Sequence, residues 1–178
     1  MSALPAPYGG AAADRVTEAD ADPDARLRRA LDFAYRYLAR RDRSVAEVRR
    51  HLEAKRCEPA AIDAAIAELL ELNYLDDAAY AQRFTEDRRQ LDGWGPERIA
   101  RKLTTLGIDE ASIDAAVSGR DHADELSAAV ELLTRKLRGT VPETDRDRER
   151  ALGFLVRKGY DLDLAYDAVR TLSRTTLD

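Results

Sequence analysis

The chain has 178 residues, of which 35% are charged and 44% are hydrophobic, and its formal net charge is −5 at pH 7. This composition is typical of a soluble, helix-rich protein, and no run of about 18 apolar residues is present to span a membrane. The single cysteine and two scattered histidines exclude an internal disulfide and give no metal-ligand spacing. The N-terminus also lacks a signal-peptide layout, so we expect a cytoplasmic protein.

Residues 1–24 are rich in Ala, Pro, Gly and Asp and lack apolar periodicity, which predicts a disordered acidic tail. The charge then reverses: residues 1–25 carry five acids against one base, whereas residues 26–57 carry eleven bases against four acids. An autoinhibitory contact between these segments is one interpretation. A solvated tail is the simpler one and is preferred.

Three amphipathic helices are predicted between residues 25 and 73. The first covers residues 25–40, the second opens at Ser44 in a capping box with Glu47, and the third begins at Pro59. Their apolar positions are Leu27, Leu31, Tyr35, Leu38, Val45, Val48, Leu52, Ile62, Ile66, Leu69 and Leu70.

Three more helices are predicted between residues 74 and 119. Asp76 is a good N-cap for the first, Gly95 and Pro96 open the second, and Gly107 ends it before Asp109 caps the third. Their apolar positions are Tyr80, Ala81, Phe84, Ile99, Leu103, Leu106, Ile113 and Val117.

A third group of helices is predicted between residues 120 and 178. A long helix ends near Leu137, Thr144 caps the next one, and Gly159 ends that helix before the last one begins. Their apolar positions are Leu126, Ala129, Val130, Leu133, Leu152, Leu155, Val156, Leu164, Ala165, Ala168 and Val169.

These groups are copies of one unit. Five core positions of the middle group recur 51 residues earlier and 52 residues later, always as apolar or small residues, and Gly107 aligns with Gly159 and with Arg56. The sequence therefore predicts an all-α protein, an elongated array of three tandem three-helix repeats with about nine helices in helix-turn-helix-like units. The repeats cover residues 25–73, 74–119 and 120–178. A single bundle of coincidentally amphipathic helices is the alternative.

No group of residues in the sequence has the pattern of a catalytic or metal-binding site. Cys57 aligns with Ile108 and Tyr160, so we expect a buried small hydrophobe, and His51 is interpreted as a helix-surface residue. Asp76 and Asp77 are better explained by capping than as an acid pair. We therefore expect no enzyme, no cofactor, no metal and no small-molecule substrate.

Basic residues gather on the outward faces of the first two repeats. The cluster favours a binding surface for nucleic-acid phosphates or for an acidic protein, although a solvated face explains any single arginine. Arg36, Arg41, Lys55, Arg56, Arg83 and Arg89 share this expected surface with the candidate contact residues. The candidate contacts are Arg40, Arg43, Arg49, Arg50, Arg88, Arg98, Arg101 and Lys102.

Two apolar features complete the pattern. Trp94 is the only tryptophan and precedes the middle helix of the second repeat, where it either packs over the helix start or anchors a protein interface. The middle helix of the third repeat is apolar nearly all round, with Leu152, Phe154, Leu155 and Val156. Such a helix is either central in the core or docks a partner.

The motif LNYLDDAAYAQRF at residues 72–84, followed by Gly-Trp-Gly-Pro at 93–96 and the spaced Ile and Leu residues of 99–108, resembles the RecX family of recombination regulators. The resemblance covers about residues 27–173. Arg56 departs from it, because many such repeats have glycine there, and the long tail is a second departure.

The resemblance implies three tandem three-helix repeats and a role in binding RecA recombinase filaments on DNA. It implies that such a protein lies in the filament groove and dampens strand exchange, ATP hydrolysis and coprotease action in recombination, repair and the SOS response. DNA phosphates would be a weaker partner, and no membrane would be involved. A protein that binds DNA directly, without RecA, and a peptide-binding helical solenoid remain as alternatives.

Overall fold

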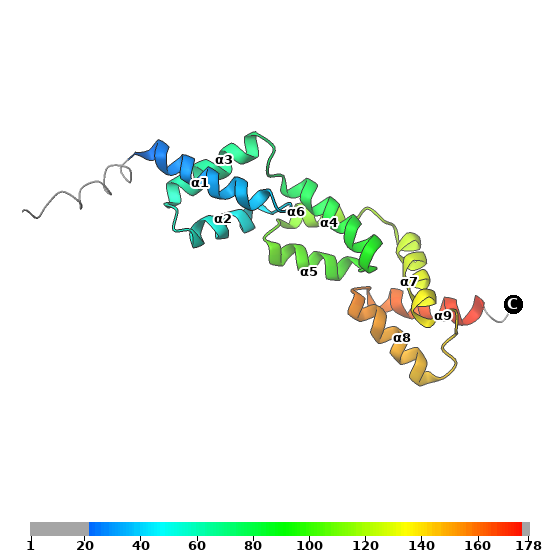
Figure 1. The fold of residues 1–178 in the computed structure, drawn as a ribbon. Helices are drawn as coiled ribbons and strands as arrows, with labels where there is room; N and C mark the ends of the chain where they lie inside the picture. Colours follow the sequence, from blue (N-terminus) through cyan, green and yellow to red (C-terminus); the bar gives the residue numbers. More distant parts are fainter. Residues whose placement is uncertain (1–21, 176–178) are drawn as a thin grey trace, which may run out of the picture. The chain divides into compact units, whose positions relative to one another are not determined.

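The structure is a computed structural model that describes residues 22–175, and within that range it contains nine α-helices and no strand (Figure 1). This part of the chain confirms the all-α fold of three tandem three-helix units. Most of the predicted tail lies outside the described residues. The helices are α1 (Pro23–Leu38), α2 (Val45–Ala54), α3 (Pro59–Glu71), α4 (Asp77–Asp92), α5 (Pro96–Leu106), α6 (Glu110–Val117), α7 (His122–Leu137), α8 (Asp145–Lys158) and α9 (Leu162–Thr175).

The chain divides into two compact units. One comprises Met1–Arg43 with Glu47–Leu75, as far as these residues are described, and the other comprises Ser44–Ala46 with Asp76–Asp178. The first unit thus holds α1, α3 and α2 from Glu47 onward, and the second holds the first two residues of α2 and the other six helices.

In the first unit, α1 packs along α3, and α2 contributes the fully buried Val48 and Leu52. Helix α1 begins two residues earlier than predicted, because the Asp22 carboxylate accepts a hydrogen bond from the Asp24 amide and Pro23 occupies the first turn. The small Ala30 and Ala34 are its fully buried residues, while the predicted leucines beside them are only half-buried.

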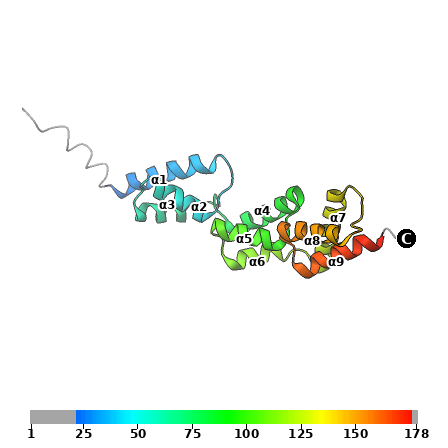
Figure 2. The ribbon, with the colours of Figure 1, turned by 90° about the horizontal axis from the view of Figure 1, so that it is seen from below.

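In the second unit, α4 and α5 pack on α6, and α7 and α8 pack on α9. Both ribbon views show α8 beside α9 (Figures 1 and 2). Three of the predicted caps are confirmed: the side chains of Asp76, Asp109 and Thr144 accept hydrogen bonds from the amides of Ala79, Ser112 and Asp147. The capping box at Ser44 and Glu47 stays a prediction, and the Ser44 hydroxyl donates to the Leu106 carbonyl at 2.6 Å.

All three repeats end their middle helix in the same way. The amide of the residue after the stop position donates to the carbonyl five residues earlier: Cys57 to Leu52, Ile108 to Leu103 and Tyr160 to Leu155, at 3.1–3.2 Å. Gly107 and Gly159 take the left-handed conformation at φ 84° and 91°, and Arg56 takes it too at φ 57°. The left-handed conformation costs a non-glycine residue roughly 1–2 kcal/mol. The aligned arginine nevertheless adopts it and ends its helix with the same turn as the two glycines.

The aligned core positions are buried in every repeat except at Cys57 and Val117, which are half-buried. The predicted burial of Cys57 is therefore only partly right, because Ile108 and Tyr160 at the same position are almost fully covered. Burial still raises the pKa of the Cys57 thiol above its usual range. It likewise raises the pKa of the Tyr160 hydroxyl to about 12.

Candidate partner-binding surface

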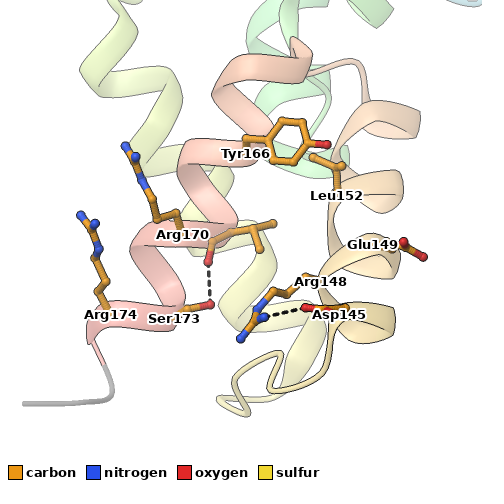
Figure 3. A pocket seen from close by; sticks show the side chains of 9 residues that line it. Asp145, Arg148, Glu149, Leu152, Tyr166, Arg170, Ser173 and Arg174 are labelled. Atoms are coloured by element: carbon orange, nitrogen blue, oxygen red, sulfur yellow. Dashed lines mark hydrogen bonds and ion pairs between the residues drawn. The ribbon is translucent and has the colours of Figure 1, made fainter.

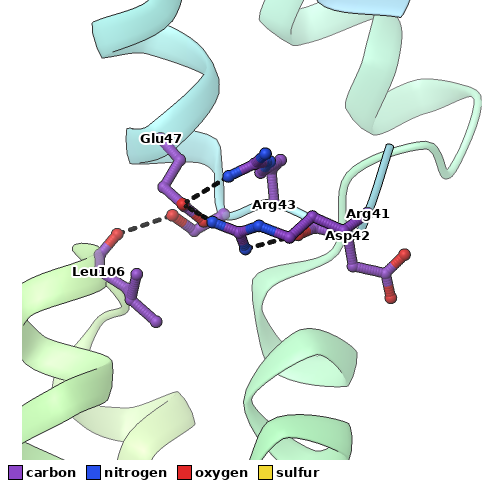
Figure 4. Close-up of polar contacts among 6 residues, drawn as sticks. Arg41, Asp42, Arg43, Glu47 and Leu106 are labelled. Atoms are coloured by element: carbon purple, nitrogen blue, oxygen red, sulfur yellow. Dashed lines mark hydrogen bonds and ion pairs between the residues drawn. The ribbon is translucent and has the colours of Figure 1, made fainter. Parts of the chain in front are cut away.

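The candidate arginines of the first repeat divide into exposed and packed side chains. Arg40 is exposed, with no ion pair to another described residue, and Arg50 on α2 is also exposed. Arg43, in contrast, keeps only 13% of its side chain exposed and forms an ion pair with Glu47 at 3.3 Å. The Glu47 carboxylate also accepts a hydrogen bond from Arg41 (Figure 4).

Arg43 also lies 4.1 Å from the ring centroid of Tyr37, and the other neighbour of that ring is His51, stacked at 4.0 Å. His51 is thus half-buried in a stack rather than a simple surface residue. Burial, together with the nearby Lys55, Arg43 and Arg40 charges, lowers the pKa of His51.

Arg49 pairs with Asp63 of α3 at 2.6 Å, with 41% of its side chain exposed. Pairs this open to solvent contribute about 0–1 kcal/mol to stability. Arg49 can therefore exchange Asp63 for an acidic group on a partner at little cost.

In the second repeat, Arg101 and Lys102 are adjacent and exposed on α5. Arg101 pairs with Glu97 across one helical turn at 3.3 Å, with 64% of its side chain exposed. Lys102 has no ion pair within the described range. These two cations form the accessible charge of α5.

Arg88 and Arg98 instead converge on Trp94. The Arg98 guanidinium lies 4.2 Å and that of Arg88 5.8 Å from the indole centroid, and Phe84 meets the indole edge-on at 6.3 Å. Arg88 also pairs with Asp92 at 2.5 Å. The structure thus brings three predicted site residues together, in a packed cluster within the second unit.

This cluster forms the junction between α5 and the end of α8. The amides of Gly95 and Glu97 donate to the carbonyls of Lys158 and Gly159 at 2.8 and 3.1 Å. The Lys158 ammonium donates to the Asp92 carbonyl at 2.6 Å. Arg98 donates to the carbonyl of the residue before Lys158, Arg157, at 3.1 Å. The Gly-Trp-Gly-Pro segment therefore joins the second repeat to the third, and a role of Trp94 as an anchor for a partner stays a prediction.

The expectation that Arg89 belongs to the basic surface is wrong. Its side chain is 4% exposed and pairs with Glu125 of α7, itself 8% exposed, at 2.7 Å, and it also donates to the Val117 carbonyl at 2.7 Å. A sequence signal existed, because Ala81, Thr85 and Arg89 recur at four-residue spacing on α4 and all three are buried.

Within residues 22–175, no helix is long and apolar enough to cross a membrane. The same range shows no group of three or more His, Cys, Asp or Glu side chains that could hold a metal ion. The described surface carries accessible cations at Arg40, Arg49 and Arg50 in the first unit and at Arg101 and Lys102 in the second.

Comparison with protein families matches three sequence models in chain order. The first three-helix domain of RecX matches residues 30–69, the second matches residues 76–117, and the third matches residues 123–169. Each match spans one three-helix repeat of the structure.

Named relatives and solved structures agree with this assignment. "Regulatory protein RecX" of Streptomyces coelicolor is 32% identical over 164 residues, covering 91% of this chain and 87% of the relative. The protein of the same name from Mycolicibacterium smegmatis is 34% identical over 155 residues, covering 83% and 81%. The crystal structure of RecX from Lactobacillus salivarius shares the fold, with a TM-score of 0.74 at 20% identity, covering 84% of this chain and 97% of that one.

Proposed function

The chain belongs to the RecX family, and on this premise we propose that it binds RecA recombinase filaments on DNA and restrains their activity. The restrained activities are strand exchange, ATP hydrolysis and coprotease action, in recombination, repair and the SOS response. The observation that carries the proposal is the match of all three RecX domains, in order, to the three repeats. Because RecA acts on cellular DNA, the protein would work in the cytoplasm.

The proposed mechanism is binding and not catalysis. A RecA–DNA filament presents acidic protein surface and phosphate, and the exposed cations of the repeats are suited to both. The candidate contacts are the exposed Arg40, Arg50 and Lys102 together with Arg49 and Arg101, whose ion pairs are exposed. Arg43, Arg88 and Arg98 would act mainly by holding the surface in shape.

Strand exchange driven by RecA tests the function directly. Substoichiometric amounts of the protein are expected to slow product formation, because one bound regulator affects many subunits of a filament. The measurement is joint-molecule formation on gels, with co-sedimentation of the protein with RecA–DNA filaments beside it. If the protein neither inhibits nor co-sediments, the proposal fails. Equally tight binding to naked DNA, with a steep salt dependence, would favour direct DNA binding instead.

Charge reversal on α5 tests the cationic surface. Combining Arg101→Glu with Lys102→Glu is expected to weaken filament binding about tenfold, because two accessible charges become repulsive toward an acidic partner. The measurement is co-sedimentation titration, with circular dichroism to verify helicity.

The matched control combines Arg135→Glu with Arg146→Glu, which reverses two exposed arginines of α7 and α8 and changes the net charge equally. It should bind filaments within about twofold of the unmodified chain, because only general screening by net charge is altered. Equal weakening by both pairs would show that net charge, and not the α5 surface, is responsible.

A further inference from the structure

Helices α8 and α9 form an open groove of about 510 Å³ on the surface of the third repeat (Figure 3). Leu152, Tyr166 and Val169 supply its apolar lining, and the Tyr166 ring and the Leu152 side chain lie close to each other across it. The groove lies entirely on the third repeat.

On each helix, a further exposed apolar side chain lies one helical turn from a residue that lines the groove. Val156 of α8 is 40% exposed, Leu162 of α9 is 51% exposed and Tyr166 is 57% exposed. Leu162 and Tyr166 are one helical turn apart, as are Leu152 and Val156, so each helix contributes a stripe. Contiguous apolar stripes of this kind on a soluble protein mark interaction sites.

The other two repeats carry polar or small residues at the same positions. Leu152 and Tyr166 align with Arg49 and Asp63 of the first repeat, which form an ion pair at 2.6 Å across α2 and α3. In the second repeat the aligned residues are Ala100 and Asp114. The fold therefore does not require apolar side chains at these positions.

The remaining two positions repeat this contrast. Val156 aligns with Glu53 and Thr104, and Leu162 aligns with Pro59 and Glu110. Only the third repeat thus has large apolar residues at all four of these positions, whereas Val169, which also lines the groove, aligns with the apolar Val117 and Ile66. A surface that only faced water would have no physical reason to differ from its counterparts in this way.

Arginines border the groove. Three arginines and two carboxylates line the groove: Arg148, Arg170 and Arg174, with Asp145 and Glu149. Among the described residues, Arg148 and Arg170 form ion pairs only within their own helices, with the exposed Asp145 and with Asp167, at 2.8 and 2.7 Å. Such pairs are weak, so the guanidinium groups remain available to carboxylates on a partner.

We infer that the α8–α9 groove docks an amphipathic helix with acidic flanks on the surface of the protein partner. Apolar side chains of that helix, one turn apart, would fit the stripe of Leu152, Val156, Leu162 and Tyr166, and its flanking carboxylates would face the bordering arginines. The inference rests on the proposed function, in which the partner is RecA, and it adds which surface of the chain contacts the partner protein and what that contact recognises.

Photo-crosslinking from inside the groove tests this. The variant Tyr166→p-benzoylphenylalanine of the full chain keeps an aromatic side chain at this half-exposed position. The variant is mixed with RecA filaments on single-stranded DNA and irradiated. The expected adduct joins position 166 to a RecA helix that carries Asp or Glu beside its apolar face, identified by mass spectrometry. The control places the same photoreactive residue at Leu91, which is 75% exposed on α4, and should not label that helix.

Co-sedimentation of the same variant separates the two proposals. If the variant does not sediment with filaments, and the unmodified chain does not either, the proposed function fails. If both sediment but position 166 yields no RecA adduct, the groove inference is overturned. An adduct to a second copy of this chain also overturns it, because the occupant is then the protein itself.

A second variant measures how much the groove contributes. Combining Leu162→Ser with Tyr166→Ser removes two exposed apolar side chains, so the fold should persist while filament affinity falls about tenfold. Leu91→Ser is the matched control and should leave affinity unchanged. Unaltered affinity in the groove variant would contradict the inference.

Discussion

Arg89→Met is expected to lower the free energy of unfolding of the second unit by about 3–5 kcal/mol, because it leaves the buried Glu125 carboxylate without its partner. The loss is a large share of the total stability of an ordinary domain, about 5–15 kcal/mol. Glu125 Oε2 is buried without a hydrogen-bond partner in the described part of the structure, so the carboxylate depends on the bond that Arg89 donates to its other oxygen.

Tryptophan fluorescence during urea titration is the appropriate measurement. Trp94 is the only tryptophan and lies in the second unit, so its emission follows that unit separately from the first. This matters because a chain of two compact units need not unfold in one step.

Two controls define the cause. Arg101→Met breaks the exposed pair with Glu97 and should cost at most about 1 kcal/mol. Combining Arg89→Met with Glu125→Leu removes both charges and should recover part of the loss. If Arg89→Met costs no more than Arg101→Met, the buried pair does not have the role assigned to it.

Gly95→Ala should destabilise the junction between the second and third repeats by about 3 kcal/mol or more, at the upper end of overpacking effects. An added Cβ would fall 2.5 Å from the carbonyl carbon of Gly159 and 2.6 Å from the Tyr160 nitrogen. Both are backbone atoms and cannot turn aside as a side chain can. The Gly95 amide also donates to the Lys158 carbonyl at 2.8 Å, so moving the two backbone segments apart would break that hydrogen bond.

The measurement is again urea unfolding followed by Trp94, which adjoins the substituted residue and should also change its native emission. Gly119→Ala is the control, because its Cβ would meet only ordinary contacts, at 3.9 Å from Arg89 and 4.0 Å from Ala116. That variant should remain within about 0.5 kcal/mol of the unmodified chain. Equal stability of the two variants would show that the junction opens readily.

Much of the fold could be predicted because it depends on residues close together in sequence. Asp76, Asp109 and Thr144 cap helices through amides three residues away, and Gly107 and Gly159 end helices by their own conformational freedom. The 51- and 52-residue offsets then identify Ile99, Leu103 and their counterparts as core. Helix α1 begins two residues before its predicted start, because its Asp-Pro N-terminus lies in a polar segment whose composition is typical of a disordered tail.

The candidate site was predictable only in part. The exposure of Arg50, Arg101 and Lys102 follows from their position opposite the apolar face of a short helix. Arg98 lies on the same helix as Arg101 and Lys102, yet it packs over Trp94 and bonds to Arg157. Helical periodicity cannot distinguish them, because the difference is made by the end of α8, which approaches one side of α5 and not the other.

By itself, then, the sequence determined the three repeats, their caps and their core positions, since these follow from interactions within a few turns and from apolar periodicity. Only the tertiary structure decided which of the predicted surface arginines are structural. Arg89 is buried in an ion pair with Glu125, which lies 36 positions along the chain in another repeat, and Trp94 is half-buried between the Arg98 guanidinium over its ring and Phe84 at its edge. A charged side chain in a helix is exposed or buried according to what packs against it, and that neighbour is fixed only when the repeats come together.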